Sequence, residues 1–524
     1  MAKSLGLIIV FISLFSLPSP TLSSMLSNAI DFWCDKTPHP QTCLHFATIN
    51  HHLQDGIPKS ASQFKNFILR IAMDQSVKAQ IRIVWLGSKC RSKEEKAAWR
   101  DCINLYQDTI TILNQTLDPI KQSTSYDLQT WLSTALTNLD TCQTGFQEFG
   151  VGNNVLPLIP NKTISKIISN FLALNNASSS ITPKTMSSQN GFPSWLSPGD
   201  RKLLESPLLS PNVVVAKDGS GNFKTIKEAL EAVPKRSGKN RFVIYVKPGV
   251  YNENIEIGRN LNNIMLYGDG IRLTIISGSR SIGGGSTTFN SATVAVVGDG
   301  FIGRGITFRN TAGPQKHQAV ALRCGADHSV FYRCAFEGYQ DTLYVHSQRQ
   351  FFKECHIYGT LDFIFGNAAV VFQSCNIYAR RPMQKQKIAI TAQGRSDPNQ
   401  NTGISIQNSR VMAAEDLVPM LGSFKTFLGR PWKEYSRTVF LQTYLDALVD
   451  PAGWLEWNGD FACDTLYYGE YKNLGPRAST GGRVKWHGYH VITSATQASK
   501  FTVENFIAGR SWLPATGIPF FSGL

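Results

Sequence analysis

Three short stretches in the second half of the chain decide the fold: Phe331-Tyr-Arg-Cys334, Phe352-Lys-Glu-Cys355 and Phe372-Gln-Ser-Cys375. They recur at a period of about 21 residues, and Phe308-Arg-Asn-Thr311 is interpreted as an earlier copy. A period of this size, with strand-like runs and Gly-rich corners, is typical of one turn of a parallel β-helix. The repeat therefore predicts a right-handed parallel β-helix, an all-β solenoid in which stacked turns lie about 4.8 Å apart and equivalent residues form columns.

The sequence around this repeat has the same character. From Val213 onward, short β-branched runs alternate with Gly and Asn, as expected of short strands and turns. The exception is the stretch from Thr225 to Val233, whose helical pattern predicts a cap at the start of the domain. We therefore assign residues 213–524 to the β-helix.

The repeat also predicts where chemistry could take place. The residues seven positions after Thr311, Cys334 and Cys355 are Gln318, Asp341 and Asp362. The residue seven positions after Cys375 is Pro382, so a polar column is not a general property of the repeat. Two carboxylates about one strand spacing apart repel each other, which raises the pKa of one of them and is costly without a purpose. The alternative is that both aspartates cap turns on the solvent side.

The first half of the chain has a different pattern. Apolar residues recur at helical spacing from about Met25 to Asn176, which predicts an all-α helical bundle over residues 25–177. Residues 178–212 are rich in Ser, Pro and Gly and are expected to be a linker. The linker contains Arg201, Lys202, Leu203 and Leu204, which is either a protease processing motif or an accidental basic pair.

The N-terminus has the features of a signal peptide. Met1-Ala2-Lys3 precedes an apolar run from Leu5 to Leu17, followed by prolines and small polar residues, so residues 1–24 are expected to direct secretion. The run is too short to cross about 30 Å of hydrocarbon, so no membrane anchor is expected. Three Asn-X-Ser/Thr motifs are candidate glycosylation sites, all in the helical half: Asn114, Asn161 and Asn176.

Ten cysteines in a secreted chain are candidates for disulfides. They fall into two groups of five, so each group has at least one free thiol or a bridge joins the groups. Cysteines of the repeat could also be core packing, and we expect that of at least one of them. The two groups are Cys34, Cys43, Cys90, Cys102 and Cys142, then Cys324, Cys334, Cys355, Cys375 and Cys463.

The chain carries a formal net charge of +15, most of it in the second half. A basic surface either keeps the protein soluble or attracts a polyanion. For a secreted protein we expect that polyanion to be an acidic polysaccharide and not a nucleic acid.

Neither a metal nor another cofactor is expected. Acidic residues are not clustered as a calcium-assisted lyase requires, and His and Cys of this half lack zinc-like spacing.

Four motifs give the chain a family resemblance. The segments Gly338-Tyr-Gln-Asp-Thr-Leu-Tyr344, Gly359-Thr-Leu-Asp-Phe-Ile-Phe-Gly366, Leu428-Gly-Arg-Pro-Trp432 and Gln318-Ala-Val-Ala-Leu-Arg323 resemble the signature segments of plant pectin methylesterases. The helical half resembles the inhibitors of these enzymes. The resemblance implies a β-helix esterase preceded by an inhibitor-like pro-region.

The resemblance also implies roles for individual residues. Asp362 would be the nucleophile and Asp341 the acid and base, with Arg430 holding Asp362. Gln318 and Gln340 would line the oxyanion site, and the sugar would contact Thr288, Gln318, Arg430 and Trp432. Trp432 taken alone could also be a core residue. In the helical half, the resemblance implies the disulfides Cys34–Cys43 and Cys102–Cys142, leaves Cys90 unassigned, and makes Arg201 to Leu204 the maturation site.

The function implied is hydrolysis of methyl esters of galacturonate units in pectin, in the plant cell wall, through an acyl-enzyme on an aspartate. The pro-region would cover the cleft until a protease cleaves the linker, although such a region could also assist folding or export. Separate inhibitor proteins are further candidate partners. Two alternatives remain: a glycoside hydrolase on the same fold, since close carboxylates also suit that reaction, and a secreted regulator without catalysis.

Overall fold

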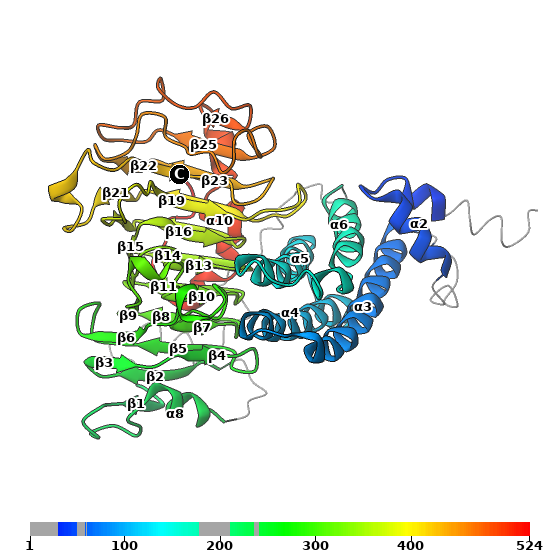
Figure 1. Cartoon of the computed structure of the whole chain (residues 1–524), viewed down its shortest axis with the longest axis horizontal. Helices are drawn as coiled ribbons and strands as arrows, with labels where there is room; N and C mark the ends of the chain where they lie inside the picture. Colours follow the sequence, from blue (N-terminus) through cyan, green and yellow to red (C-terminus); the bar gives the residue numbers. More distant parts are fainter. Residues whose placement is uncertain (1–29, 50–57, 59, 178–209, 235–239) are drawn as a thin grey trace, which may run out of the picture.

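The computed structural model describes residues 30–49, 58, 60–177, 210–234 and 240–524. The expected signal peptide and the motif Arg201 to Leu204 lie outside these residues. The described chain forms a helical half and a β-half, and the helices pack against one wall of the β-half (Figure 1). Among the described residues, no helix is long and apolar enough to cross a membrane.

The helical half is a bundle of long helices with its own apolar core. Capping boxes fix the starts of two of them, at Ser92 with Glu95 and at Thr124 with Asp127. Both disulfides implied by the resemblance are present, and Cys102–Cys142 joins α4 to α5. The helices are α2 (Pro40–Ile49), α3 (Ala61–Leu86), α4 (Lys93–Leu117), α5 (Ser125–Glu148) and α6 (Asn161–Ala177).

The β-half is a parallel β-helix with three walls, each a parallel sheet. The first wall, called the cleft sheet below, contains β4 (Ile255–Ile257), β7 (Val294–Val296), β10 (Leu322–Cys324), β13 (Leu343–Val345), β16 (Leu361–Gly366), β19 (Ile388–Gln393) and β22 (Thr426–Gly429). This wall faces α4 and α5 (Figure 1).

The other two walls complete each turn of the solenoid. The second wall contains β1 (Val213–Val215), β2 (Phe242–Val246), β5 (Ile264–Tyr267), β8 (Ile302–Arg304), β11 (Ser329–Tyr332), β14 (Arg349–Lys353), β17 (Ala369–Gln373), β20 (Gly403–Gln407), β23 (Arg437–Leu441), β25 (Tyr467–Tyr471) and β26 (Tyr489–Val491). The third wall contains β3 (Gly249–Asn252), β6 (Thr274–Gly278), β9 (Thr307–Asn310), β12 (Ala335–Glu337), β15 (His356–Gly359), β18 (Asn376–Ala379), β21 (Arg410–Ala413) and β24 (Tyr444–Leu445).

Strand register confirms the column of repeats from the second wall. Phe331 pairs with Phe352, and Phe352 pairs with Phe372, so the three aromatic rings stack on successive turns inside the solenoid. Their centroids lie 4.7 and 4.6 Å apart. The period of the sequence is therefore the period of the stacked turns.

The earlier copy, Phe308 to Thr311, was wrongly aligned with this column. Phe308 lies on β9 in the third wall and pairs with Phe336, not with Phe331. The core holds two phenylalanine columns on adjacent walls, and the sequence pattern alone did not separate them. Thr311 consequently lies outside the cysteine column.

The six remaining cysteines are free and buried. Cys334, Cys355 and Cys375 follow one another at the same corner of successive turns, since the residues after them pair in register. Their side chains belong to the apolar core, as do those of many small apolar residues in solenoids. The odd number in each group is therefore explained by free thiols, not by a bridge between the halves.

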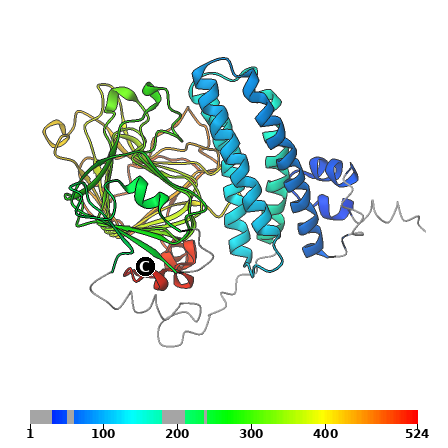
Figure 2. The ribbon, with the colours of Figure 1, turned by 90° about the horizontal axis from the view of Figure 1, so that it is seen from below.

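Helices cover one end and one side of the solenoid. The predicted cap is α8 (Ile226–Glu231), whose N-cap Thr225 forms a capping box with Glu228. Near the C-terminus, α9 (Ala495–Ser499) and α10 (Val503–Ile507) pack against the outside of the second wall (Figure 2).

The three glycosylation motifs differ in exposure. Asn114 and Asn176 are exposed. Asn161 is 7% exposed; its amide donates to the carbonyl of Leu139, and its carbonyl oxygen accepts from the Tyr106 hydroxyl. A glycan on this nitrogen would require opening the bundle, so the structure contradicts glycosylation of Asn161.

Candidate active site

Asp341 and Asp362 lie on neighbouring turns of the cleft sheet. Asp341 precedes β13, Asp362 lies in β16, and the Asp341 amide donates to the Leu361 carbonyl at 3.1 Å. Both residues have left-handed backbone conformations, with φ of 61° and 53°. The register between β16 and β19 also shifts beside Asp362, and such a bulge re-aims a side chain.

Arg430 holds Asp362 at both carboxylate oxygens. Its Nε donates to Oδ1 at 2.8 Å and its Nη2 donates to Oδ2 at 2.6 Å, a bidentate pair. Arg430 follows directly after β22, and its amide donates to the Thr391 carbonyl, which fixes its backbone to the neighbouring strand. Its guanidinium lies 4.3 Å from the ring centroid of Trp457.

The two carboxyls differ electrostatically. Burial raises the pKa of Asp341 well above its ordinary value, and the negative charges of Asp362 and Glu148 add to this. Burial also raises the pKa of Asp362, but Arg430 opposes that rise through hydrogen bonds and charge. One carboxyl is therefore suited to stay protonated while its neighbour is ionised.

Gln318 and Gln340 flank this pair. The amide of Ala319 donates to the carbonyl of Gln340 at 3.2 Å, so the two glutamines lie on neighbouring turns. Both are half-buried, and among the described residues neither side-chain amide has a hydrogen-bond partner. Both amides thus remain available to a substrate oxygen.

Aromatic rings line the cleft sheet beside the carboxyls. Tyr344 stacks on Phe365 with centroids 4.2 Å apart, and Trp432 lies against both at 6.4 and 5.9 Å. Trp432 is half-buried and rests on Gly394, where a Cβ atom would lie 2.7 Å from its ring. The ring is therefore held at the surface of the cleft sheet, outside the solenoid core.

The helical half covers this surface, chiefly with α5. The Thr288 amide donates to Glu148 Oε2 at 3.0 Å. Further hydrogen bonds link the two halves along the helix: Thr141 Oγ1 to His346 Nε2 at 3.0 Å, Asn367 Nδ2 to Thr137 Oγ1 at 2.8 Å, and Ser396 Oγ to Asp140 Oδ2 at 2.5 Å. Thr288 is 3% exposed as a result.

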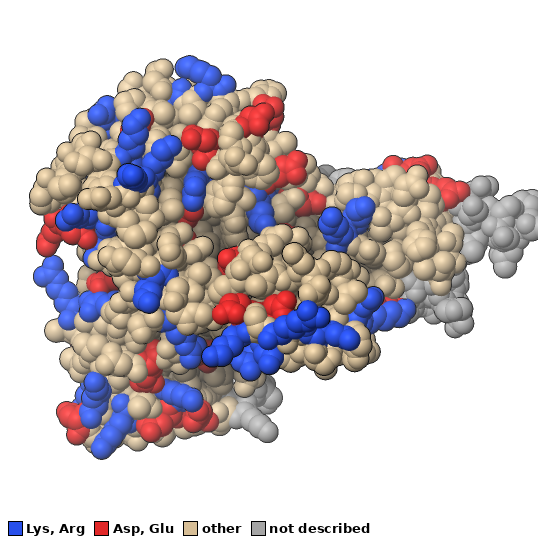
Figure 3. All heavy atoms as spheres, viewed as in Figure 1, with Lys and Arg blue, Asp and Glu red and all other residues tan. Residues whose placement is uncertain are grey.

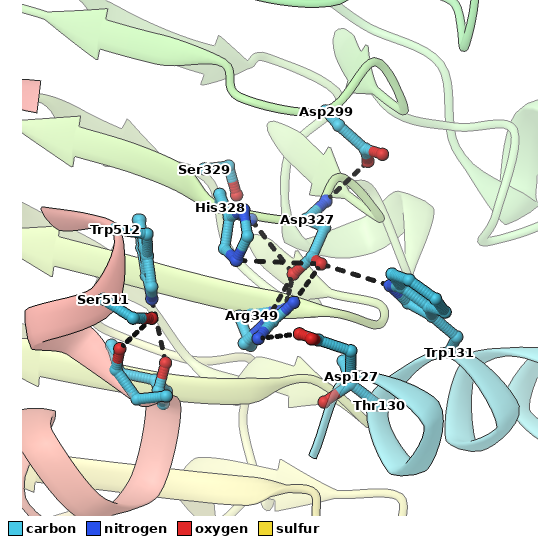
Figure 4. Close-up of polar contacts among 12 residues, drawn as sticks. Asp127, Thr130, Trp131, Asp299, Asp327, His328, Ser329, Arg349, Ser511 and Trp512 are labelled. Atoms are coloured by element: carbon cyan, nitrogen blue, oxygen red, sulfur yellow. Dashed lines mark hydrogen bonds and ion pairs between the residues drawn. The ribbon is translucent and has the colours of Figure 1, made fainter. Parts of the chain in front are cut away.

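A second group of contacts lies at the corner between the cleft sheet and the second wall (Figure 4). Arg349 donates to Asp127 of α5 at 2.7 Å and to both oxygens of Asp327 at 2.9 and 2.6 Å. The indole of Trp131, also on α5, donates to Asp327 at 3.4 Å. Arg349 is 3% exposed, so this ion-pair cluster is buried between the halves.

Sequence reasoning missed the residues that join the halves. Neither Glu148 nor Arg349 lies in a recognisable motif, because the docking of one domain on another leaves no periodic pattern. One signal was available: Thr130, Thr134, Thr137, Thr141 and Thr144 recur at helical spacing along α5. A polar stripe on a helix that is otherwise apolar indicates a face with a polar partner.

Comparison with known proteins follows the same division of the chain. Residues 212–510 match the family described as Pectinesterase, and residues 28–174 match the family described as Plant invertase/pectin methylesterase inhibitor. The chain belongs to the pectinesterase family. Among pectinesterases, it is 58% identical to "Probable pectinesterase/pectinesterase inhibitor 17" of Arabidopsis thaliana over 99% of both chains, and 58% identical to "Pectinesterase 2" of Citrus sinensis, also over 99% of both.

Solved pectinesterase structures match the β-half. "Pectin methylesterase from Carrot" is 61% identical with a TM-score of 0.60, and it covers 61% of this chain and 100% of its own. A pectin methylesterase from Aspergillus niger is 32% identical with a TM-score of 0.51, covering 59% of this chain and 98% of its own. The share of this chain that these structures cover is about the share that residues 213–524 make up.

Proposed function

We propose that this protein hydrolyses the methyl esters of galacturonate units in pectin, releasing methanol and acidic pectin. The observation that carries the proposal is the pairing of Asp341 with Asp362, of which only Asp362 is bound by Arg430. An ester hydrolase needs a nucleophile, a proton donor for the leaving alkoxide and donors for the carbonyl oxygen. The site supplies each of these with a different side chain.

In the first step, ionised Asp362 attacks the carbonyl carbon of the methyl ester. Gln318 and Gln340 donate their amide hydrogens to the developing oxyanion, and a bond forms between the aspartate oxygen and the ester carbon. The bond to methoxide then breaks, and protonated Asp341 gives its proton to the methoxide. Methanol leaves and an acyl-enzyme anhydride remains.

In the second step, Asp341 is ionised and acts as the base. It removes a proton from a water molecule, which attacks the acyl carbon of the intermediate. The bond to Asp362 breaks, so the nucleophile returns as a carboxylate beside Arg430 and Asp341 is protonated again. The pectin chain leaves with a free carboxyl group in place of the methyl ester.

The pectin chain would be held along the cleft sheet. The ring of Trp432 offers a face for stacking of a sugar, and Thr288 lies in the loop before β7 of the same sheet. The chain would act outside the cell, in the cell wall, after removal of residues 1–24. The positive excess supports attraction to acidic pectin, and Figure 3 shows Lys and Arg spread over the face in view.

We also propose that the helical half is an autoinhibitory pro-region until a protease cleaves the linker at Arg201 to Leu204. Its contacts to Thr288, His346, Asn367 and Ser396 occupy the same face of the cleft sheet that a polymer would need. Separate inhibitor proteins of the same helical fold would compete for that face. Assistance in folding or export is compatible with the same contacts.

The test is methanol release from highly methylated pectin by the segment 213–524. This segment has its own closed core, and the carrot structure shows that a relative of this extent folds alone. We expect methanol from the wild type, a loss on the order of 10³-fold or more in Asp362→Ala, and no new reducing ends. The uncleaved chain is expected to release little methanol until the linker is cut.

Product analysis separates the proposal from its alternatives. New reducing ends without methanol would assign the carboxyl pair to glycoside hydrolysis, although Gln318 and Gln340 have no evident use in that reaction. A folded segment that binds pectin but releases no product would make the protein a regulator. An uncleaved chain as active as the cut one would refute autoinhibition alone and leave the esterase standing.

A further inference from the structure

The helical half exposes a row of apolar side chains on α3. Ile81 is 68% exposed and Trp85 is 59% exposed. Val77 and Val84 are exposed too, and they lie beside Ile81 because residues three and four apart share one side of a helix. Single exposed apolar side chains are common on proteins, whereas a contiguous row of them indicates a contact surface.

Cations run along the same side of α3. Lys78 and Arg82 precede Trp85, and Lys89 follows it with its Nζ 5.1 Å from the centroid of the indole ring. The distance along the helix axis from Lys78 to Lys89 is about 16 Å. We call Lys78, Arg82, Trp85 and Lys89 the α3 face. The turn after α3 and the start of α4 add four more exposed cations: Arg91, Lys93, Lys96 and Arg100.

These positive charges are not neutralised within the described part of the chain. None of the seven cations forms an ion pair there, and residues 75–100 contain only two acids, Glu94 and Glu95. Lys78 and Arg82 stand four residues apart, and like charges at this spacing destabilise a helix. Figure 3 shows a band of Lys and Arg across α3 and α4. Such a band is suited to a ligand that brings negative charge.

The α3 face lies away from the catalytic cleft. α3 packs against α2, α4 and α6, whereas α4 and α5 contact the β-half, as in Asp108 with Arg259 and Glu148 with Thr288. Figure 2 shows α3 on the side of the bundle farther from the solenoid. The α3 face therefore stays accessible while the helical half covers the cleft.

Charge decides among the possible occupants of the α3 face. A second copy of this chain docked there would place the same cations against one another, which is unfavourable. Anionic lipids lie mainly in the cytoplasmic leaflet, which a chain exported by residues 1–24 does not meet. An acidic polysaccharide offers carboxylates for the cations and a sugar ring for the exposed indole of Trp85.

We propose that the α3 face binds unesterified homogalacturonan, with carboxylates on Lys78, Arg82 and Lys89 and a sugar ring stacked on Trp85. The inference goes beyond the proposed function and rests on it only for the source of the polymer, which is the product of ester hydrolysis. The site belongs to the inhibitor-like half and acts without the cleft. It keeps the uncleaved chain, whose cleft is still covered, on stretches of pectin that are already acidic.

The test measures binding of the uncleaved chain to oligomers of unesterified galacturonate and to fully methylated oligomers of the same length. The chain carries Asp362→Ala, so that neither probe is altered. For the acidic oligomer we expect Kd to rise about tenfold when Lys78→Gln, Arg82→Gln and Lys89→Gln are combined, since each exposed charge contributes little alone. Added salt should weaken the same binding by screening.

The contribution of the ring is tested separately. Trp85→Ala is expected to raise Kd for the acidic oligomer about fivefold, within the usual range for one aromatic contact. Ile120→Ala is the control, because it removes an apolar side chain that is 88% exposed between α4 and α5. Unchanged binding in Trp85→Ala would contradict the proposed stacking.

A matched charge control lies in the β-half. Lys385→Gln, Lys472→Gln and Lys500→Gln, combined at three exposed positions, remove the same charge and should change Kd less than about twofold. An equal loss in the two triple variants would reduce the attraction to net charge and overturn the site. Equal binding of acidic and methylated oligomers would overturn it as well.

Two further outcomes separate this inference from its alternatives. Tighter binding to phosphatidylserine vesicles than to the acidic oligomer, lost in the α3 triple variant, would assign the α3 face to a membrane and overturn the proposal. Absence of methanol from the wild-type segment 213–524 would overturn the esterase alone, because binding to the acidic oligomer is measured without catalysis.

Discussion

Arg430 binds both carboxylate oxygens of Asp362, at 2.8 and 2.6 Å, whereas Asp341 on the neighbouring turn forms no ion pair within the described part of the chain. Two like carboxyls are thereby made unequal. The clamped one is held as the anion, and its neighbour, with a pKa raised by burial and by the charge of Asp362, is held as the acid.

Replacing Arg430 by lysine is expected to lower methanol release about a hundredfold, because an ammonium is a point charge and cannot bind both oxygens in a plane. Catalysis requires ionised Asp362, so activity falls as the pH falls through its pKa. A weaker clamp raises that pKa and moves the acidic limb of the pH profile upward. Arg477→Lys, at a partly exposed arginine whose Nε donates to the Ala447 carbonyl, is the control. An unmoved acidic limb in Arg430→Lys would contradict the assignment.

Docking of the helical half is expected to weaken as the pH rises from about 4 to about 7. Burial raises the pKa of Asp101, bound to Asn290, and of Glu148, bound to the Thr288 amide, to about 7 from 3.8 and 4.5. The docked state therefore binds more protons than the separated state. Its stability is full below the ordinary pKa values and is lost as the pH rises through the raised ones.

This dependence can be measured on the linker-cut protein by size exclusion at a series of pH values. Asp101→Asn removes one titrating group and should flatten the change, whereas Asp118→Asn, at an exposed cap residue, should not. Retention of the helical half that is independent of pH would show that these carboxyls do not govern docking.

The ion pair between Arg349 and Asp127 is expected to hold the helical half from outside the catalytic pair. Asp127→Asn keeps the size of the side chain but removes its charge from the buried cluster, at a cost of about 2 kcal/mol to docking. The uncleaved variant should therefore release methanol faster than the uncleaved wild type. Glu94→Gln, in the first turn of α4 and only partly buried, is the matched control. Equal rates in the uncleaved variant and the uncleaved wild type would argue against a role of the Arg349–Asp127 ion pair in docking.

Gly394 is expected to be necessary for the position of the Trp432 ring. A Cβ atom at this position would lie 2.7 Å from Cε3 of the indole, so Gly394→Ala must displace the ring. We expect KM for pectin to rise about tenfold with a smaller change in kcat, since the loss is one of sugar stacking. Gly523→Ala, where a Cβ atom meets nothing within 4 Å, should have no effect. An unchanged KM would assign Trp432 no part in binding.

The sequence predicts the β-helix and the carboxyl pair because one physical quantity governs both. The period of the repeat is the length of one turn, so equal spacing from Cys334 and Cys355 places Asp341 and Asp362 on neighbouring turns. The same counting misplaced Thr311, since strands of the second and third walls have similar composition. Gln318 still lies beside the pair, because Ala319 bonds to the turn that carries Gln340.

The contacts between the halves could not be predicted in the same way. Asp127 is the third residue of a helix with a capping box, which explains an acidic residue there without any partner in the other half. Asn161 has a glycosylation motif, but its burial depends on how α6 packs against Tyr106 and Leu139. Each case is decided by tertiary packing, for which a local pattern carries no signal.

The docked helical half bridges turns of the solenoid that do not touch one another. Asp108 binds Arg259 after β4, Asp127 binds Arg349 on β14, and Asp140 binds Ser396 after β19. In a stack where each turn contacts only its neighbours, fraying can begin at any weak turn and spread. A rigid bundle bound to several separate turns restrains this fraying. Dissociation of the helical half therefore removes the restraint at the same time as it exposes the cleft sheet.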